Sequence, residues 1–266
     1  MLDQQSIESL LQTSFFGRFL YIFPELDSTN TFARKLIDEG APEGTVVLAD
    51  YQRAGKGRFG HSWQSSPGVN ILMSVIIRPR ILIEAIQNIT LATANILIQS
   101  FQKFLRQEKE QDIPFSVKWP NDIFVQGRKL GGILAESGIR NKSVEFVIVG
   151  IGINVNQDIR ELPAEIRNNS TSFYTETGRN YSREKLIVRI LHDFEKKYID
   201  LERRGYDHVI TEWKKNCRQL GQEVQIETPL IKEAGRLVDI NEHGLPLYQT
   251  ADGRIKMIVT GRIITV

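Results

Sequence analysis

The stretch Gly55-Lys56-Gly57-Arg58-Phe59-Gly60-His61-Ser62-Trp63 restricts the possible folds of this chain more than any other. Its glycines allow the backbone to come close to a ligand. Its alternating cations, Lys56 and Arg58, suit a phosphate or a carboxylate, and no acidic residue lies between them. The stretch predicts an anion-binding loop, although a solvent-exposed glycine-rich turn can have the same composition.

Two nucleotide-binding folds have glycine-rich loops of this kind, and the sequence argues against both. Residues 55–60 fit the G-x-G-x-x-G dinucleotide fingerprint, which needs a strand before it and a helix that opens within it. The apolar residues 45–51 can form the strand, but residues 61–68 have loop composition and end in Pro-Gly. A P-loop is excluded because no Gly-Lys is followed by Ser or Thr at the required spacing.

The bulk composition is that of an ordinary globular protein of one or two domains. The 266 residues are 41% hydrophobic and 25% charged, and the net charge of +2 does not indicate nucleic-acid binding. The single cysteine, Cys217, cannot form an internal disulfide and fits a reducing compartment. Residues 1–14 have no basic signal-peptide start, and the apolar run 146–155 is too short to span a bilayer. We therefore expect a cytoplasmic protein that does not bind membranes.

Hydrophobic periodicity divides the chain into a mixed α/β part and a smaller all-β part. Helices are expected over 29–39 and 83–105 and from Ser182 onward. Strands are expected over 45–52, 69–77, 115–119, 123–125, 130–137 and 144–154, with a hairpin turn at 126–128. Short β-like runs then follow at 224–226, 236–240, 245–248 and 257–259. The expected domains are 1–216 and 217–266, the second of them near the lower size limit for independent folding.

Further polar chemistry lies at the ends of the expected strands. Lys118-Trp119-Pro120-Asn121-Asp122 offers an amide for a base or ribose and a carboxylate for Mg²⁺ beside phosphates, although the same residues also favour a polar turn. Lys129 follows the hairpin turn, and Gly131-Gly132 then marks either a close ligand or a bulge. Asn154 ends a buried apolar strand, where its amide needs a partner.

Taken together and in order, these segments resemble the biotin protein ligase family. The loop 55–63 is similar to that family's biotinyl-adenylate loop. The other matching segments are Ser28-Thr29-Asn30, Tyr51-Gln52, 118–122, 128–133 and 152–155. The resemblance extends over residues 18–266. It implies an α+β fold, with a mixed, largely antiparallel sheet and helices as in a class II synthetase-like catalytic domain, followed by a small C-terminal SH3-like β barrel.

The resemblance implies an ATP-dependent ligase. Such an enzyme activates biotin as biotinyl-5′-AMP and transfers it to a specific lysine of a biotin carboxyl carrier domain, as in acetyl-CoA carboxylase, with ATP and Mg²⁺ as cofactors. Two alternatives stay open: a lipoate or octanoate protein ligase of the same fold, and a non-catalytic biotin- or nucleotide-binding regulator. Residues 1–18 are few and not basic, so we expect no sequence-specific DNA binding. A homodimer is possible.

The resemblance also assigns roles to individual residues. The implied biotin-binding residues are Ser28, Thr29, Asn30, Gln52, Lys56, Gly57, Arg58, Lys129, Gly131 and Gly132. The implied ATP-binding residues are Arg58, Trp63, Lys118, Asn121, Lys129 and Asn154. Arg58, Lys129 and Asp122 are the expected catalytic residues, and Asp122 is also the expected metal ligand.

The sequence departs from the family pattern at two places. Lys56 stands where the family commonly has arginine, which keeps the positive charge but loses the bidentate fork. The C-terminal residues 263–266 lack the arginine that some relatives place near ATP.

Overall fold

The computed structural model describes residues 1–228 and 231–265. Its main sheet follows the order β1-β2-β3-β7-β6-β5-β4. The strands are β1 (Leu20–Phe23), β2 (Val46–Ala49), β3 (Ile71–Ile77), β4 (Phe115–Lys118), β5 (Asp122–Val125), β6 (Arg128–Arg140) and β7 (Ser143–Ile153). The edge pair β1 and β2 is parallel, whereas the other neighbours are antiparallel. The expected mixed, largely antiparallel sheet is confirmed.

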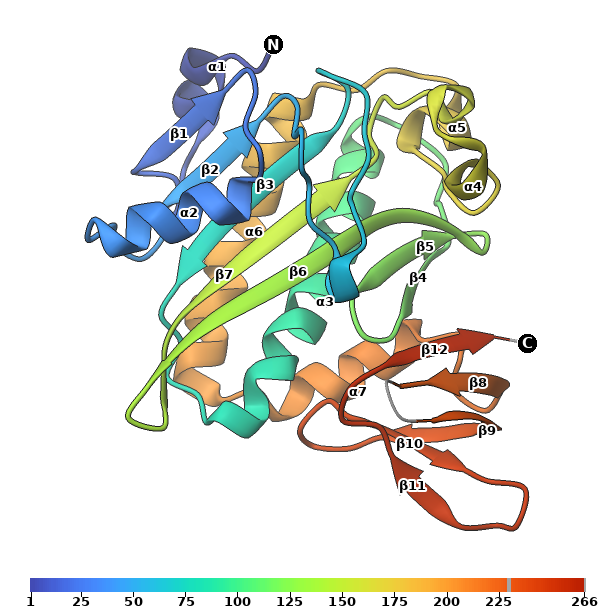
Figure 1. The fold of residues 1–266 in the computed structure, drawn as a ribbon. Coiled ribbons are helices and arrows are strands. Elements are labelled where there is room, and N and C mark those ends of the chain that lie inside the picture. The colour runs from blue at the N-terminus through green and yellow to red at the C-terminus, as the bar shows by residue number, and fades with distance from the viewer. Residues whose placement is uncertain (229–230, 266) are drawn as a thin grey trace.

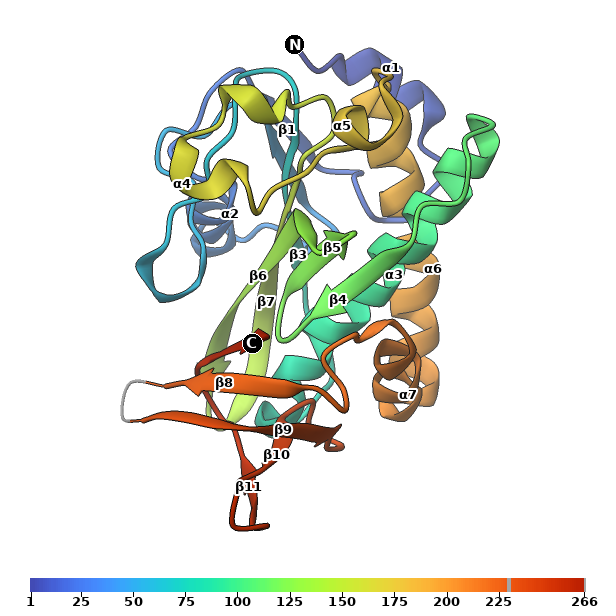
Figure 2. The ribbon, with the colours of Figure 1, turned by 90° about the vertical axis from the view of Figure 1, so that its right-hand side faces the viewer.

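Two long helices, α3 (Ile86–Gln107) and α6 (Arg183–Arg204), cover one face of this sheet, and α2 (Thr29–Asp38) covers part of the other (Figures 1 and 2). Alternate residues of β3, such as Met73 and Val75, join the large core with α3 and α6, while Ile76 packs in a smaller core with α2. Because α2 covers only one end of its face, the rest of that face is left for the loop 55–63 (Figure 1). The shorter helices are α1 (Gln4–Leu10), α4 (Ala164–Arg167), α5 (Phe173–Thr177) and α7 (Asp207–Asn216).

The C-terminal part of the chain forms a separate five-stranded antiparallel sheet, as expected for the small β module. Its strands, in the order β11-β10-β9-β8-β12, are β8 (Glu223–Glu227), β9 (Lys232–Ile240), β10 (Pro246–Gln249), β11 (Ile255–Met257) and β12 (Arg262–Thr265). Hydrogen bonds attach it to the main body: the Trp119 indole N–H donates to Gly244 O at 2.9 Å, and Asn88 Nδ2 donates to Glu242 O at 3.1 Å. These contacts fix β12 next to the main sheet. The boundary at residues 216 and 217 stays a prediction.

Several expected boundaries need correction. The expected strand at 257–259 is wrong for its last two residues, because β11 ends at Met257. The Ile258 N–H still donates to Pro246 O at 2.9 Å, but Pro246, the first residue of β10, has no N–H to return a bond and continue the ladder. The expected helix from residue 83 begins with a 3₁₀ turn, Ile83–Ala85, before α3. Trp119 lies in the turn after β4 and not in the strand.

Helices α1, α4, α5 and α7 and strands β1 and β12 were not expected from the sequence. Across residues 1–228 and 231–265, no helix is both long and apolar enough to cross a bilayer.

Candidate active site

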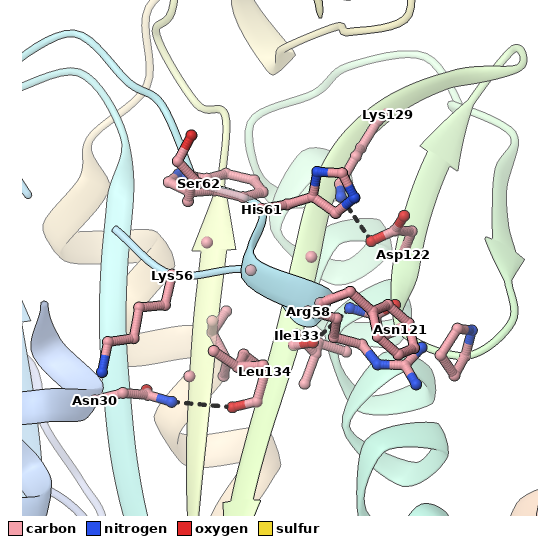
Figure 3. A pocket seen from close by; sticks show the side chains of 18 of the residues that line it. Asn30, Lys56, Arg58, His61, Ser62, Asn121, Asp122, Lys129, Ile133 and Leu134 are labelled. Atoms are coloured by element: carbon pink, nitrogen blue, oxygen red, sulfur yellow. Dashed lines mark hydrogen bonds and ion pairs between the residues drawn. The ribbon is translucent and has the colours of Figure 1, made fainter. Parts of the chain in front are cut away.

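A cavity of about 440 Å³ lies between the open face of the main sheet, the start of α2, the loop 55–63 and strand β12. Figure 3 shows Asn30 and Lys56 on one side of it, and Asn121, Asp122 and Lys129 on the other. Two sets of lining residues carry most of the polar chemistry of the cavity. The amide end comprises Ser28, Thr29, Asn30 and Gln52, and the cationic end comprises Arg58, Lys118, Lys129 and Arg262 with the carboxylate of Asp122.

The loop 55–63 folds back on itself over the sheet. The Gly57 N–H donates to His61 O at 2.7 Å, and the Trp63 N–H donates to Gly55 O at 2.8 Å. Between these bonds the chain makes only a single 3₁₀ turn, Arg58–Gly60. A Cβ atom at Gly55 would lie 2.6 Å from Trp63 O, so this position requires glycine. Because no α-helix opens within the loop, the rejection of the dinucleotide fingerprint is confirmed.

At the amide end, Gln52 holds the first turn of α2. Its Oε1 accepts the Thr29 N–H at 2.7 Å and lies 3.0 Å from the Thr29 hydroxyl. Ser28 occupies the N-cap position, but its side chain makes no capping hydrogen bond. Gln52 therefore supplies an acceptor for a free N–H at the start of α2, which every helix start needs. This bond ties α2 to the segment that leads into the loop.

The cationic end contains more positive than negative charge. Lys129 Nζ lies 2.7 Å from Asp122 Oδ1, and the same ammonium lies 5.6 Å from the centre of the Trp63 ring. Asn121 Nδ2 donates to Ile133 O at 2.8 Å, which fixes the turn that carries Asp122. Asp122 is the one carboxylate among the described residues that line the cavity. A single carboxylate cannot offset four cations, so this end is suited to an anionic ligand.

The pKa values of two cations reflect this environment. Burial lowers the pKa of the Arg58 guanidinium, against the opposing effect of Asp122. Burial also lowers the pKa of Lys118, and repulsion from Lys129 and Arg262 lowers it further, while Asp122 raises it. An anion bound here would favour the charged form of Lys118.

The glycines of β6 and β7 provide a seat for an aromatic ring. A Cβ atom at Gly152 would lie 2.7 Å from Trp63 Cε2, and one at Gly132 would lie 3.3 Å from Trp63 Cζ3. The sheet also has a bulge here, because the register between β5 and β6 shifts between Ile123 and Phe124. Of the two explanations that the sequence left open for the paired glycines, the bulge is present. The group that approaches Gly132 in this structure is the indole of Trp63, and a ligand at this position stays a prediction.

Most of the predicted site residues line this cavity, but Gly131 and Asn154 do not. Gly131 is buried, and a Cβ atom there would lie 2.9 Å from Gly152 O. Asn154 is also buried and donates its Nδ2 to Thr171 O at 2.9 Å, which is the partner its position required. The structure therefore gives Gly131 and Asn154 packing and hydrogen-bonding roles behind the cavity, and their roles toward a ligand stay predictions.

Strand β12 contributes cavity residues that the sequence did not identify: Arg262, Ile263 and Ile264. Arg262 Nη1 lies 3.1 Å from His61 Nε2, so the second sheet touches the loop 55–63. Arg262 also lies 3.7 Å from Glu227 Oε2 on β8. An arginine thus reaches the cationic end from the C-terminal strand, although the last four residues have none. No local pattern marked it, because its position depends on how the two sheets pack.

Comparison with known proteins agrees with this architecture. Residues 22–154 match the model of the biotin/lipoate A/B protein ligase family. The chain is 34% identical over 262 residues to the bifunctional ligase/repressor BirA of Bacillus subtilis, covering 98% of this chain and 78% of the relative. It is 27% identical over 267 residues to the biotin–[acetyl-CoA-carboxylase] ligase of Mycobacterium tuberculosis, covering 99% and 95%.

Among solved structures, the biotin protein ligase of Aquifex aeolicus in complex with biotin and ATP superposes with a TM-score of 0.76. The two chains are 30% identical, and the match covers 92% of this chain and 97% of the other. The chain therefore belongs to the biotin/lipoate A/B protein ligase family.

Proposed function

We propose that this chain is a biotin–protein ligase, which joins biotin to ATP to form biotinyl-5′-AMP and then transfers biotin to a lysine of a carrier domain of a biotin-dependent carboxylase. The observation that carries the proposal is one cavity with two chemically different ends, an amide end and a cationic end. Biotin has a polar ureido head and a carboxylate tail, and ATP brings the phosphates. The similar ligase from Aquifex aeolicus was solved with both molecules bound.

The first step joins two anions. A biotin carboxylate oxygen attacks the α-phosphorus of ATP, a new P–O bond forms, and the bond to pyrophosphate breaks. Because both reactants are negative, the step needs positive charge around the α-phosphate and the leaving group. Arg58 and Lys129 are proposed to face the α-phosphate, and Lys118 and Arg262 to hold the pyrophosphate side. All four line the cationic end. No protein nucleophile is required, because the biotin carboxylate is itself the attacking group.

Trp63, Asn121 and Lys56 are proposed to hold the remaining parts of the two substrates. The Trp63 ring lies on the sheet over Gly132 and Gly152 and lines the cavity, and a flat adenine is proposed to stack against it. Asn121 is proposed to contact the nucleotide next to Trp63. Lys56 is exposed on the loop, so its share in anion binding depends on the loop closing over the ligand.

Mg²⁺ is proposed to bind here with the nucleotide. Within residues 1–228 and 231–265, no cluster of three His, Cys, Asp or Glu side chains is placed to hold a metal. Among its described lining residues, the cavity instead has one carboxylate, Asp122. A single carboxylate fits Mg²⁺, which commonly binds one carboxylate together with substrate phosphates and waters. Asp122 would supply the carboxylate, and Mg²⁺ would neutralise charge on the phosphates. Lys129, which pairs with Asp122 at 2.7 Å, would then be released toward the ligand.

In the second step, the neutral ε-amino group of the carrier lysine attacks the acyl carbon of biotinyl-5′-AMP. An amide bond forms, the acyl–phosphate bond breaks, AMP leaves, and the amine loses a proton. Water would destroy the same anhydride, so the site must exclude it until the carrier arrives. The loop 55–63 covers the sheet and touches β12 through His61 and Arg262, which suits a lid.

The alternative of a lipoate or octanoate protein ligase is less well supported. The head of lipoate is a dithiolane without N–H or C=O groups, so it could not hydrogen-bond to the polar groups of the amide end. A cysteine-dependent transferase is not supported either. Cys217, which is buried, does not line the cavity, and burial raises the pKa of its thiol.

The direct test is transfer to a carrier. The chain, ATP, Mg²⁺, biotin and the isolated carrier domain of an acetyl-CoA carboxylase are incubated, and the mass of the carrier is measured. The proposal predicts the addition of one biotinyl group, its loss when the acceptor lysine is changed to arginine, and no addition when ATP is omitted. An unmodified carrier in the complete mixture would refute the proposal.

A further inference from the structure

Three strands of the main sheet meet below Asn30 in a single row. Ser74 of β3 pairs with Gly150 of β7, and Gly150 pairs on its other side with Leu134 of β6. The Asn30 side chain, from the first turn of α2, lies over Gly150 in the middle of this row. A Cβ atom at Gly150 would lie 2.3 Å from Asn30 Oδ1. The missing side chain at Gly150 thus makes the space in which the Asn30 amide sits.

The two sides of the Asn30 amide meet different partners. On the β3 side, the Ser74 hydroxyl donates to Asn30 Oδ1 at 2.6 Å. On the β6 side, Asn30 Nδ2 donates to Glu136 Oε2 at 2.6 Å and to Leu134 O at 3.3 Å. Glu136 follows Leu134 by two residues, so both lie on the same face of β6.

The orientation of this amide follows from the chemistry of its partners. A backbone carbonyl and an ionised carboxylate accept hydrogen bonds and cannot donate them, so the Asn30 NH₂ group must face β6. A flipped amide would place its oxygen against those two acceptors. In the observed orientation both Nδ2 hydrogens are used, and Oδ1 keeps one lone pair. A ligand group that meets Asn30 must therefore donate a hydrogen bond to it.

We propose that Glu136 and Ser74 are positioning residues that hold the Asn30 amide as an acceptor toward the cavity, so that this end of the site selects a head group with an N–H donor. The ureido ring of biotin has two N–H groups, so this inference rests on the proposed function. Asn30 lines the cavity, whereas Glu136 and Ser74 do not. Glu136 would act through Asn30, and Ser74, whose hydroxyl oxygen also lies 2.7 Å from the Thr29 hydroxyl oxygen, would act through both Asn30 and Thr29.

The test changes the partner of Asn30 without touching the cavity wall. Glu136→Lys replaces an acceptor by a donor and therefore favours the flipped amide. Glu136→Gln is the conservative variant, because its carbonyl oxygen can still accept from Asn30. Glu145→Lys is the matched control, since Glu145 is another exposed acid, on β7, and the change in charge is the same.

The readout is a ratio between two substrates. Biotin-dependent pyrophosphate release gives kcat/KM for biotin and for an analogue in which oxygen atoms replace the two ureido N–H groups. The unchanged chain is expected to prefer biotin strongly, because the analogue leaves buried acceptors unpaired. Glu136→Lys should reduce this preference at least tenfold, mainly through the KM for biotin, while Glu136→Gln and Glu145→Lys keep most of it.

The outcomes distinguish a positioning role for Glu136 from a merely structural one, and both from failure of the proposed function. A merely structural role for Glu136 would lower activity with both substrates and leave their ratio unchanged, and that result would overturn the inference. If Glu136→Lys does not fold, Glu136→Ala is used, because it removes the same acceptor from Asn30 Nδ2: a reduced ratio supports the inference, and an unchanged ratio overturns it. If the unchanged chain releases no pyrophosphate with biotin, the proposed function fails before the variants are compared.

Discussion

At the amide end of the cavity, Thr29 and Asn30 are held by protein neighbours, whereas the cationic end has four cations and one lining carboxylate, Asp122, which pairs with Lys129. The first arrangement fixes the orientation of each polar group before a ligand arrives, which favours selection by shape and hydrogen bonding. The second leaves unbalanced charge that an anion would neutralise. The two ends should therefore respond differently to substitution: the amide end through recognition of biotin, and the cationic end through phosphate binding and rate.

The largest effect is expected for Lys129→Ala. This change removes the cation nearest Asp122 and leaves that carboxylate unpaired beside the phosphates. Loss of one preorganised charge of this kind typically costs about a hundredfold to a thousandfold in rate. The measurement is biotin-dependent pyrophosphate release at saturating substrates. Lys142→Ala, at the exposed turn between β6 and β7, is the control and should leave the rate unchanged. A Lys129→Ala rate within twofold of the unchanged protein would contradict the role of this charge.

Gly150→Ala tests the amide end separately. The new methyl group would lie 2.3 Å from Asn30 Oδ1 and displace that side chain. Overpacking of this kind costs about 1–3 kcal/mol, so we expect the KM for biotin to rise about tenfold to hundredfold. The KM for ATP should stay within twofold. Asn30→Ala removes the amide that the new methyl group would meet. Gly150→Ala should therefore lower Tm less in the Asn30→Ala protein than in the unchanged protein. Equal increases in both KM values would show that the two ends are not separate.

Arg262→Ala should have a smaller effect, and that effect should be on ATP binding and not on biotin binding. Arg262 is exposed and touches the loop through His61, so its removal should raise the KM for ATP about fivefold to tenfold and leave the KM for biotin unchanged. The effect should shrink at high salt, because the contact is accessible to solvent. Arg254→Ala is the control, because Arg254 lies in the turn between β10 and β11 of the same sheet, pairs with Asp252 and does not line the cavity. An unchanged KM for ATP would contradict the proposal that Arg262 of β12 contacts the phosphates.

The smallest expected effect is the uptake of protons by Lys118 when ATP binds. Burial and the neighbouring cations lower the pKa of Lys118 in the ligand-free protein, so part of the Lys118 population is neutral as the pH approaches the usual lysine range from below. Bound phosphate raises that pKa again, and ATP binding in alkaline buffer should therefore take up a fraction of a proton. Calorimetry in two buffers of different ionisation enthalpy measures this uptake. It should disappear in Lys118→Met, and uptake of the same size in that variant would assign the proton to another group.

The parts of the site that could be predicted are those with a local sequence signal. The start of α2 after Ser28, the hairpin turn at Gln126 and Gly127 and the paired glycines of β6 and β7 follow from short-range propensity. The parts that could not be predicted depend on contacts between distant segments. Arg262 is brought to His61 by the packing of one sheet on the other, across 201 residues of sequence.

The supporting partners of Asn30 show the same limit. Ser74 lies 44 residues from Asn30 in the sequence and Glu136 lies 106 residues away. Only the register of β3, β7 and β6 brings them together around Gly150. Nothing in the neighbouring residues distinguishes Glu136 from an ordinary exposed acid on a strand, and the capping of α2 by Gln52 is equally hidden.

The central claim, that one cavity selects biotin at its amide end and activates it with ATP at its cationic end, is tested most directly by pyrophosphate release. Three mixtures contain the protein and Mg²⁺ with ATP alone, with ATP and biotin, or with ATP and lipoate. The claim predicts release well above the ATP-alone background with biotin and background release with lipoate. Equal release with lipoate and biotin, or background release in all three mixtures, would contradict it.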